Sequence, residues 1–298
     1  AVSIGFRLVD GSLALAVGLF VLLLAPEAYL PLRQVGVQFH AAAEGVAATD
    51  DVFAVLDEAR ELAARAQRAP RTADAATVSA GPGRLVLTGL RVRRGDRLLP
   101  SVDLVAEPGT VTLIEGPSGA GKSSVFAALR GAVTFDGHAE LDGTPVSALS
   151  PATWLAWAGQ HPGLISGTIA DNVALGDDET AAASRGPLVA RALALAQAGA
   201  LDPDQQLGVQ GAGLSGGQAQ RVAVARAVFR HLRARAAVIA LDEPSSALDA
   251  ATEAALWRGI RDLADGGATV LLISHRRSAR EIADRVVTLS AAPAEVGA

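Results

Sequence analysis

The stretch that decides the fold reads VTLIEGPSGAGKSS and covers residues 111–124. A largely apolar run from Thr110 to Glu115 is typical of a buried strand, and a helical pattern follows from Lys122 to Leu129. The glycines between them let backbone N–H groups turn toward phosphate oxygens, and the helix N-terminus adds the positive end of its dipole. The sequence therefore predicts a strand, a phosphate-binding loop over residues 116–123, and a helix.

The loop residues are predicted to bind ATP. Lys122 would reach the β and γ phosphates, and the hydroxyl of Ser123 would bind Mg²⁺. Lys122 is the only lysine, because all other residues in the Lys and Arg total of 26 are arginines, so this position needs more than positive charge. A glycine-rich turn without function is the alternative. The other predicted contacts in the loop are Gly116, Pro117, Ser118, Gly119, Ala120, Gly121 and Ser124.

Two adjacent carboxylates, Asp242 and Glu243, follow the apolar run Val238–Leu241. Asp242 is predicted to hold Mg²⁺, directly or through water. Glu243 is predicted to orient or polarise the attacking water, which requires a carboxylate within hydrogen-bond reach. Acidic strand ends are common by themselves, so the pair gains its meaning from the phosphate-binding loop.

A second glycine pattern stands at residues 214–218, which are Leu214, Ser215, Gly216, Gly217 and Gln218. Its two adjacent glycines come before a helix that begins near Gln218, and a helix N-terminus favours an anion. The alternative is a helix that is simply capped by glycine. With the first loop, this pattern predicts two phosphate sites in one chain.

These motifs together resemble those of ABC ATPases over nearly all of residues 85–289. The resemblance implies an α/β P-loop NTPase core with a helical subdomain, and ATP hydrolysis in a head-to-tail dimer whose signature motif, residues 214–218, covers the partner's ATP. It assigns Gln160 to the Q-loop and to the Mg²⁺ site, Asp249 to the D-loop, and His275 to a γ-phosphate contact. A lone histidine is more often structural than catalytic.

Two positions depart from the pattern of that family. Arg94 stands where the family has an aromatic residue that stacks on adenine, and an arginine could stack through its guanidinium plane. Val209 replaces a glutamate that often couples the ATPase to membrane helices. The consequence of either change for coupling is left open by the sequence.

Further patterns complete the predicted ATP-binding domain over residues 84–290, which a linker at 68–83 precedes and a tail at 291–298 follows. Apolar runs alternate with helical patterns, as in an α/β domain. The stretch 163–232 reads as a mostly helical inserted subdomain. The other predicted strands are Leu85–Leu87, Thr269–Ile273 and Val286–Leu289, and the other predicted helices are Ala250–Leu263 and Ala279–Asp284.

The N-terminal residues 1–67 are predicted to be the end of an all-α membrane domain. No charged residue occurs from Gly11 to Pro26, and counting on to Leu32 reaches the roughly 20 residues that a bilayer core requires. We expect the final transmembrane helix at about 11–32, with residues 1–9 ending a preceding span and residues 39–67 forming a cytoplasmic helix. A signal sequence or a buried helix is the alternative. Because the chain begins at Ala1, we expect the true N-terminus to be missing.

Residues 25–33 and 39–45 look like the last membrane helix of CydD-type subunits, which belong to bacterial thiol-reductant ABC exporters. The resemblance implies the cytoplasmic membrane, a CydC-like partner, and a small-molecule cargo such as cysteine, glutathione or haem, in support of cytochrome bd assembly. Alternatives are a half-exporter for lipid, drug or peptide, and a soluble ABC ATPase acting on nucleic acid or ribosomes. A net charge of −5 gives no broad basic face for nucleic acid.

Overall fold

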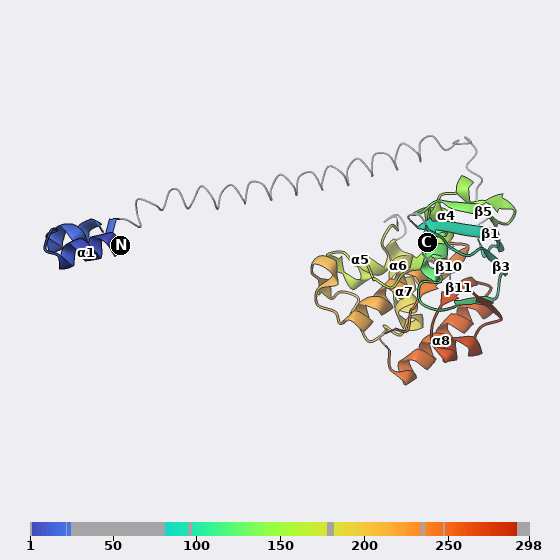
Figure 1. Cartoon of the computed structure of the whole chain (residues 1–298). Helices are drawn as coiled ribbons and strands as arrows, with labels where there is room; N and C mark the ends of the chain where they lie inside the picture. Colours follow the sequence, from blue (N-terminus) through green and yellow to red (C-terminus); the bar gives the residue numbers. More distant parts are fainter. Residues whose placement is uncertain are drawn as a thin grey trace, which may run out of the picture. The chain divides into compact units, whose positions relative to one another are not determined.

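The computed structural model describes residues 2–21, 23–24, 81–94, 97–177, 182–233, 236–246 and 248–290 of the chain (Figure 1). The chain divides into two compact units, Ala1–Pro70 and Arg71–Ala298, and each is described by itself. The predicted helix over 39–67, the linker up to residue 80 and the tail over 291–298 lie outside the described residues.

The first unit contains helix α1, Val2–Val9, and a second helical segment that begins at Leu15. Residues 10–14 form a turn, in which Gly11 has a φ of 69° and the Ser12 hydroxyl donates to Arg7 O (3.1 Å). This turn explains why the helix begins at Leu15 and not at the predicted Gly11. No helix among the described residues is both long and apolar enough to cross a bilayer, and the predicted span continues beyond residue 24, outside them.

A five-stranded parallel sheet forms the centre of the second unit. Its strand order is β12-β4-β11-β10-β7. Every residue of β10 and β11 is buried, as expected for strands with both faces of the sheet covered. This confirms the predicted α/β core. The strands are β4 (Val111–Glu115), β7 (Leu155–Ala158), β10 (Val238–Asp242), β11 (Thr269–Ile273) and β12 (Arg285–Thr288).

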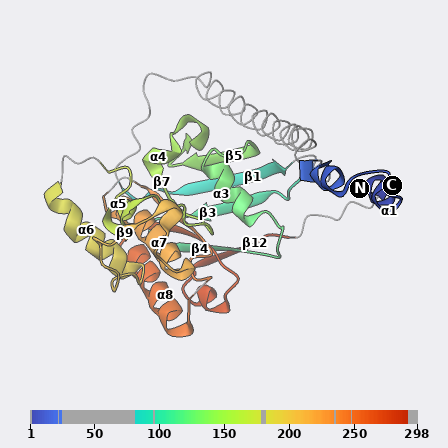
Figure 2. The ribbon, with the colours of Figure 1, turned by 90° about the vertical axis from the view of Figure 1, so that its left-hand side faces the viewer.

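Side chains of this sheet alternate between two hydrophobic cores. Leu113 and Ile239 pack into a core with helices α6 (Ala182–Leu195), α7 (Gly216–Leu232) and α8 (Ala250–Asp265). Ile114 and Ala240 pack into a core with helix α3 (Lys122–Leu129) and an antiparallel sheet. The parallel sheet is therefore the middle layer of the unit (Figure 2).

The antiparallel sheet has the strand order β2-β1-β5-β6, and β3 pairs with β1. The sequence predicted only the beginning of β1, because the other strands mix polar and apolar residues. A short 3₁₀ helix, Val146–Ala148, and α4, Pro151–Trp154, lead to β7. The strands are β1 (Leu85–Arg94), β2 (Arg97–Leu98), β3 (Val102–Ala106), β5 (Phe135–Leu141) and β6 (Thr144–Pro145).

The stretch 163–232 is mostly helical, as predicted: α6 and α7 lie in it together with α5, Ile169–Val173. It also holds the short pair β8, Gly167–Thr168, and β9, Gln206–Leu207, and a 3₁₀ turn at Val209–Gly211.

The predicted α-helix over Ala279–Asp284 is wrong. Arg277–Glu281 forms a 3₁₀ helix, η4. Asp284 N already donates to Val111 O of β4 (2.9 Å), so the chain has joined the sheet by residue 284. An α-helix that continued to this residue would use the same N–H group.

Candidate active site

The phosphate-binding loop joins β4 to α3 at the carboxyl edge of the parallel sheet. Gly116 has a φ of 148°, and a Cβ there would lie 2.5 Å from Leu289 O. Gly121, the residue before α3, has a φ of 96°, and its Cβ would lie 2.9 Å from Leu99 Cδ1. Only glycine tolerates such backbone angles and such close approach. The loop path therefore depends on these two glycines.

The Lys122 ammonium folds back over this loop. Lys122 is 7% exposed, and its Nζ donates to Gly116 O (2.8 Å) and to Pro117 O (3.0 Å). Both acceptors belong to the loop itself. The only lysine of the chain is therefore held where a phosphate would replace the carbonyls as its partner.

A cavity of about 400 Å³ opens beside the loop and collects residues from several predicted motifs. Gln160 and His275 reach it from separate loops. Leu99 was not foreseen; its signal is an apolar residue in the polar segment before β3. Gly116 lines a neighbouring cavity of about 520 Å³, and Ala120 is a buried residue of the loop itself. The lining residues are Leu99, Ser118, Gly119, Gly121, Lys122, Ser123, Ser124, Gln160 and His275.

Arg94 is the last residue of β1 and pairs with Arg97 of β2. Its side chain is outside the described part of the structure, so adenine stacking by Arg94 stays a prediction.

The two predicted carboxylates end β10 in a buried position. Asp242 is 5% exposed and Glu243 is 7% exposed. Within the described part of the chain, Asp242 Oδ1 and Glu243 Oε1 have no hydrogen-bond partner. Burial raises the pKa of Asp242, against a side-chain hydrogen bond with Ser123 and the nearby charge of Lys122. A buried carboxylate oxygen without a partner favours a cation or water as its ligand.

Glu243 lies against His275. Its φ of 52° is unusual for a glutamate, and such strained backbone often marks functional positions. The Glu243 N–H donates to Ile273 O (2.9 Å), and His275 N donates to Glu243 Oε2 (3.4 Å). His275 Nε2 is 3.4 Å from Glu243 Oε1. Burial raises the pKa of Glu243, and the charge of His275 opposes that rise. The structure thus brings two predicted catalytic residues together.

Gln160 follows β7, and its backbone is fixed from the helix that carries the second glycine motif. The buried Gln220 of α7 donates from Nε2 to Gly159 O (2.9 Å). A Cβ at Gly159 would lie 2.1 Å from Trp157 Cζ2. Gln220 was not predicted; its signal in the sequence is a polar residue just before the buried positions 222–225 of the helix.

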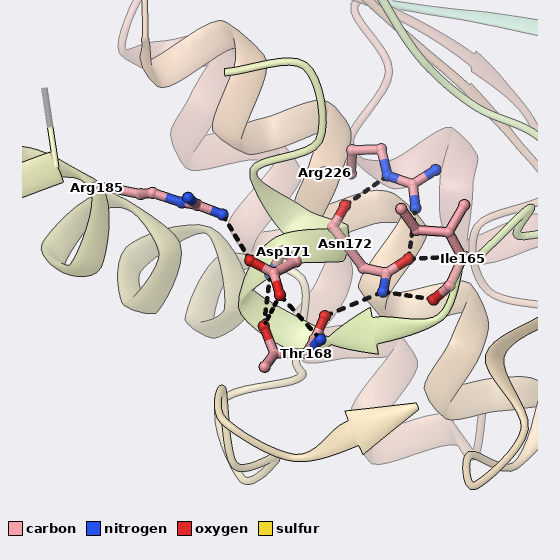
Figure 3. A network of polar contacts seen from close by, with 6 residues as sticks. All are labelled: Ile165, Thr168, Asp171, Asn172, Arg185 and Arg226. Carbon is pink, nitrogen blue, oxygen red and sulfur yellow. Dashed lines mark hydrogen bonds and ion pairs between the residues drawn. The ribbon is translucent and has the colours of Figure 1, made fainter. Parts of the chain in front are cut away.

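The segment after Gln160 is held by a polar network around the buried Asn172 (Figure 3). Asn172 Nδ2 donates to Ile165 O (2.9 Å) and Thr168 O (3.0 Å), and Asn172 Oδ1 accepts from Ile165 N (2.9 Å). Arg226 of α7 donates to Asn172 O (2.7 Å) and to Gly163 O (3.1 Å). Helix α7 therefore fixes this segment at two further points.

Helix α5 begins with a reciprocal cap in the same network (Figure 3). Asp171 N donates to Thr168 Oγ1 (2.9 Å), and Thr168 N donates to Asp171 Oδ2 (3.0 Å). Arg185 of α6 donates to Asp171 Oδ1 (3.0 Å). The hydrogen bonds from Thr168 hold the pKa of Asp171 below its ordinary value. These contacts fasten α5 to α6.

The signature motif caps α7 and lies apart from both cavities. Ser215 N donates to Gln218 Oε1 (2.8 Å), and Gln218 N donates to Ser215 Oγ (3.3 Å). Leu214 packs partly on the core. None of the five motif residues lines either cavity described above. A Cβ at Gly216 would meet nothing within 4 Å among the described residues, so packing within them does not explain that glycine.

Asp249 has a clear structural role at the start of α8. Its side chain accepts hydrogen bonds from Ala251 N and Thr252 N, each at 3.0 Å. The bonds with Thr252 lower the pKa of Asp249.

Val209 is 77% exposed in its 3₁₀ turn.

No cluster of three or more His, Cys, Asp or Glu residues among the described ones could hold a metal by itself. The predicted Mg²⁺ set, Ser123, Gln160 and Asp242, contains one carboxylate. Mg²⁺ is often bound by one or two carboxylates together with water and substrate phosphates. The residues present therefore fit Mg²⁺ that is bound jointly with ATP.

Comparison with known proteins indicates the family of the chain. Residues 99–246 match the sequence family described as ABC transporter. The glutathione/L-cysteine transport system ATP-binding/permease protein CydD of Escherichia coli (strain K12) is 33% identical over 275 residues, which cover 90% of this chain and 45% of that protein. The corresponding CydC protein of Bacillus subtilis (strain 168) is 32% identical over 311 residues, covering 100% of this chain and 51% of that protein.

Another relative is named for a different cargo. The mycobactin import ATP-binding/permease protein IrtB of Mycolicibacterium thermoresistibile is 35% identical over 269 residues, covering 83% of this chain and 44% of that protein. The chain thus spans about half the length of these relatives.

A solved structure, described as a bacterial Atm1-family ABC exporter with ATP bound, covers 72% of this chain and 38% of its own chain. Its TM-score is 0.62 at 26% identity. The family match includes the phosphate-binding loop, Gln160, the signature motif and both carboxylates. The chain therefore belongs to the ABC transporter family and carries its ATPase domain.

Proposed function

We propose that this chain binds and hydrolyses ATP as part of one half of an exporter in the cytoplasmic membrane. The observation that carries the proposal is the position of Glu243, buried at the sheet edge and 3.4 Å from His275, which in turn lines the cavity of the phosphate-binding loop. A buried carboxylate beside a phosphate site can act on an attacking water.

The loop over residues 116–123 would bind the phosphates through its backbone N–H groups and through Lys122. Mg²⁺ would be held by three groups: the hydroxyl of Ser123, the unpartnered oxygen of Asp242 and the side chain of Gln160. When bound, the ion offsets phosphate charge. Lys122 would then exchange its two loop carbonyls for phosphate oxygens.

In the hydrolysis step, Glu243 orients a water molecule whose oxygen attacks the γ-phosphorus. The bond from that phosphorus to the bridging oxygen breaks, which yields ADP and inorganic phosphate. The raised pKa of Glu243 moves it toward the range in which a carboxylate is an efficient proton acceptor at neutral pH. His275, at the edge of the same cavity, would contact the γ-phosphate.

The signature motif supports a composite site. Residues 214–218 line neither cavity, and neither a positive φ nor packing among the described residues accounts for Gly216. We infer that the motif, together with Asp249, faces the ATP of a second half-transporter in a head-to-tail pair. A CydC-like partner is the proposed second half, because the similar proteins include both CydD and CydC.

The proposed cargo is a small thiol reductant, glutathione or cysteine, or a haem-related molecule for cytochrome bd assembly. The names of the CydD and CydC relatives support glutathione or cysteine, whereas IrtB is named for the import of mycobactin, a different cargo. Large exposed apolar side chains in the first unit, Leu15 (74%), Phe20 (63%) and Leu23 (68%), support insertion in the membrane. Nucleic acid is not a proposed partner.

Glu243→Gln in the assembled, full-length transporter tests the proposal. The amide keeps the shape of the side chain but cannot accept a proton as a carboxylate does, so we expect ATP to be retained and turnover to fall by about a hundredfold or more. Glu281→Gln, the same chemical change at an exposed position of η4, serves as the matched control. Near-normal turnover of the Glu243→Gln protein would contradict the assigned role.

Uptake into inside-out membrane vesicles tests the cargo. ATP-dependent accumulation of labelled glutathione or cysteine, lost in the Glu243→Gln transporter, is the expected result. Accumulation of a siderophore or a lipid instead would favour the alternative exporter classes.

A further inference from the structure

Helix α8 carries a buried acid for which neither the motifs nor the proposed hydrolysis step has a use. Glu253 lies in the first turn of α8 and is 7% exposed. An unpaired carboxylate is costly to bury, so its partners indicate why it is there. All the partners described below belong to α8 itself or to the segment directly after His275.

Two residues of that segment contact Glu253. The Ser278 hydroxyl donates to Glu253 Oε1 (2.5 Å), and Arg276 Nε is 3.3 Å from Glu253 Oε2. From α8, Trp257 Nε1 donates to Ser278 Oγ (3.0 Å), so the serine is held from two sides. Arg276 is the next residue after His275, and Ser278 is three residues after it.

The other side of His275 is also fixed. Ser274 is 2% exposed and accepts a hydrogen bond from Arg276 N (3.1 Å). His275 itself is 55% exposed at its side chain, with Glu243 as its described contact. The imidazole therefore depends on the anchoring of its neighbours for its position, because its own side chain is only partly packed.

The geometry points to Glu253 as a positioning residue for His275: through Ser278 and Arg276, Glu253 fixes the segment that aims the imidazole at Glu243 and the phosphate cavity. This inference rests on the proposed ATP hydrolysis and adds a residue to it. Glu253 touches no reacting atom, so its effect passes entirely through His275.

A double-mutant cycle in the full-length, assembled transporter tests the inference. Glu253→Ala should lower kcat by about tenfold or more with KM for MgATP changed less than about twofold, because misplacing a catalytic group weakens the transition state more than substrate binding. In a His275→Ala background, Glu253→Ala should lower kcat no further.

Two variants keep the test interpretable. In Glu253→Gln the side chain still accepts the hydrogen bond from Ser278 but carries no charge to pair with Arg276, so we expect a loss of kcat between those of the wild type and Glu253→Ala. This variant keeps the test possible if the alanine variant folds poorly. Thr269→Val removes another buried hydrogen bond, Thr269 Oγ1 to Gly83 O (2.7 Å), at the opposite end of β11. It should lower thermal stability while leaving kcat unchanged.

Three results would each overturn the inference. The first is that Glu253→Ala lowers kcat equally with and without His275, and the second is that it raises KM while kcat stays constant. The third is that folded Glu253→Ala and Glu253→Gln proteins both keep the wild-type kcat. Failure of the proposed function differs from these results, because the wild-type transporter would then hydrolyse no ATP.

Discussion

Replacing Lys122 by arginine asks whether the only lysine of the chain is needed for its shape or only for its charge. Lys122 is 7% exposed, and its ammonium sits between two loop carbonyls at 2.8 and 3.0 Å. A guanidinium is a wide planar fork that needs partners in its plane, whereas an ammonium is compact. In the nucleotide-bound site the phosphates would occupy the cavity on one side of the ammonium, and the loop backbone bounds the other side, where Gly121 packs against Leu99 so closely that a Cβ there would be 2.9 Å away.

The size of the effect follows from these contacts. Losing one hydrogen bond to a charged group costs about 1.5–3 kcal/mol, and over-filling a packed site costs about 1–3 kcal/mol. Since about 1.4 kcal/mol corresponds to a factor of ten, Lys122→Arg should weaken MgATP binding markedly and lower turnover at least about tenfold. The fold should stay intact, because the change is confined to the loop.

This expectation is checked by measuring MgATP affinity and ATPase turnover for three transporters: the wild type, Lys122→Arg and Lys122→Ala. Circular dichroism confirms that each protein is folded. Arg258→Lys, at an exposed position of α8, is the control for a basic-residue exchange outside the site. If the arginine variant binds and hydrolyses ATP like the wild type, positive charge suffices and the argument from shape is refuted.

Three other predictions follow from burial. Burial raises the pKa of Glu243, and hydrolysis needs its ionised form, so kcat/KM should fall as the pH drops through a value above 4.5, the ordinary pKa of a glutamate. A pH profile of kcat/KM that falls only at or below 4.5 would contradict this. The raised pKa also means that ionised Glu243 costs stability at neutral pH, so Glu243→Gln should raise the melting temperature of the nucleotide-free protein. Asn172→Ala leaves Ile165 N and Ile165 O without their side-chain partner and removes the hydrogen bond from Arg226 Nη2 to Asn172 Oδ1. It should lower the free energy of unfolding by about 2–4 kcal/mol in urea titrations, whereas a loss under about 0.5 kcal/mol would show that the network matters little.

The central sheet could be predicted from the sequence because its strands have an unmistakable pattern. Residues 238–241 of β10 and 270–273 of β11 are apolar without interruption, as is typical of strands buried on both faces. The resemblance to ABC ATPases then predicted which side chains gather at the carboxyl edge. Of these, Glu243 and His275 are within 3.4 Å of each other in the structure.

The antiparallel sheet could not be predicted in the same way. Strand β5 reads FDGHAEL, with exposed polar residues on one face and a glycine in the middle. That glycine, Gly137, has a φ of 93°, and a Cβ there would lie 2.3 Å from Gly89 O at an irregularity in the β1–β5 pairing. Contacts such as Gln220 to Gly159 were also hidden, because they join residues 61 positions apart.

The division of the hydrophobic interior by the parallel sheet has a consequence for how such a chain can change over time. Phe126, beneath the nucleotide loop, and Phe229, in the helical part, belong to different cores. Substitutions at residues that share no partners usually add in their effects on stability. The helical side can therefore accumulate replacements without repacking the side that supports the phosphate loop. Such a partition would let the same nucleotide-binding core be combined with different helical parts.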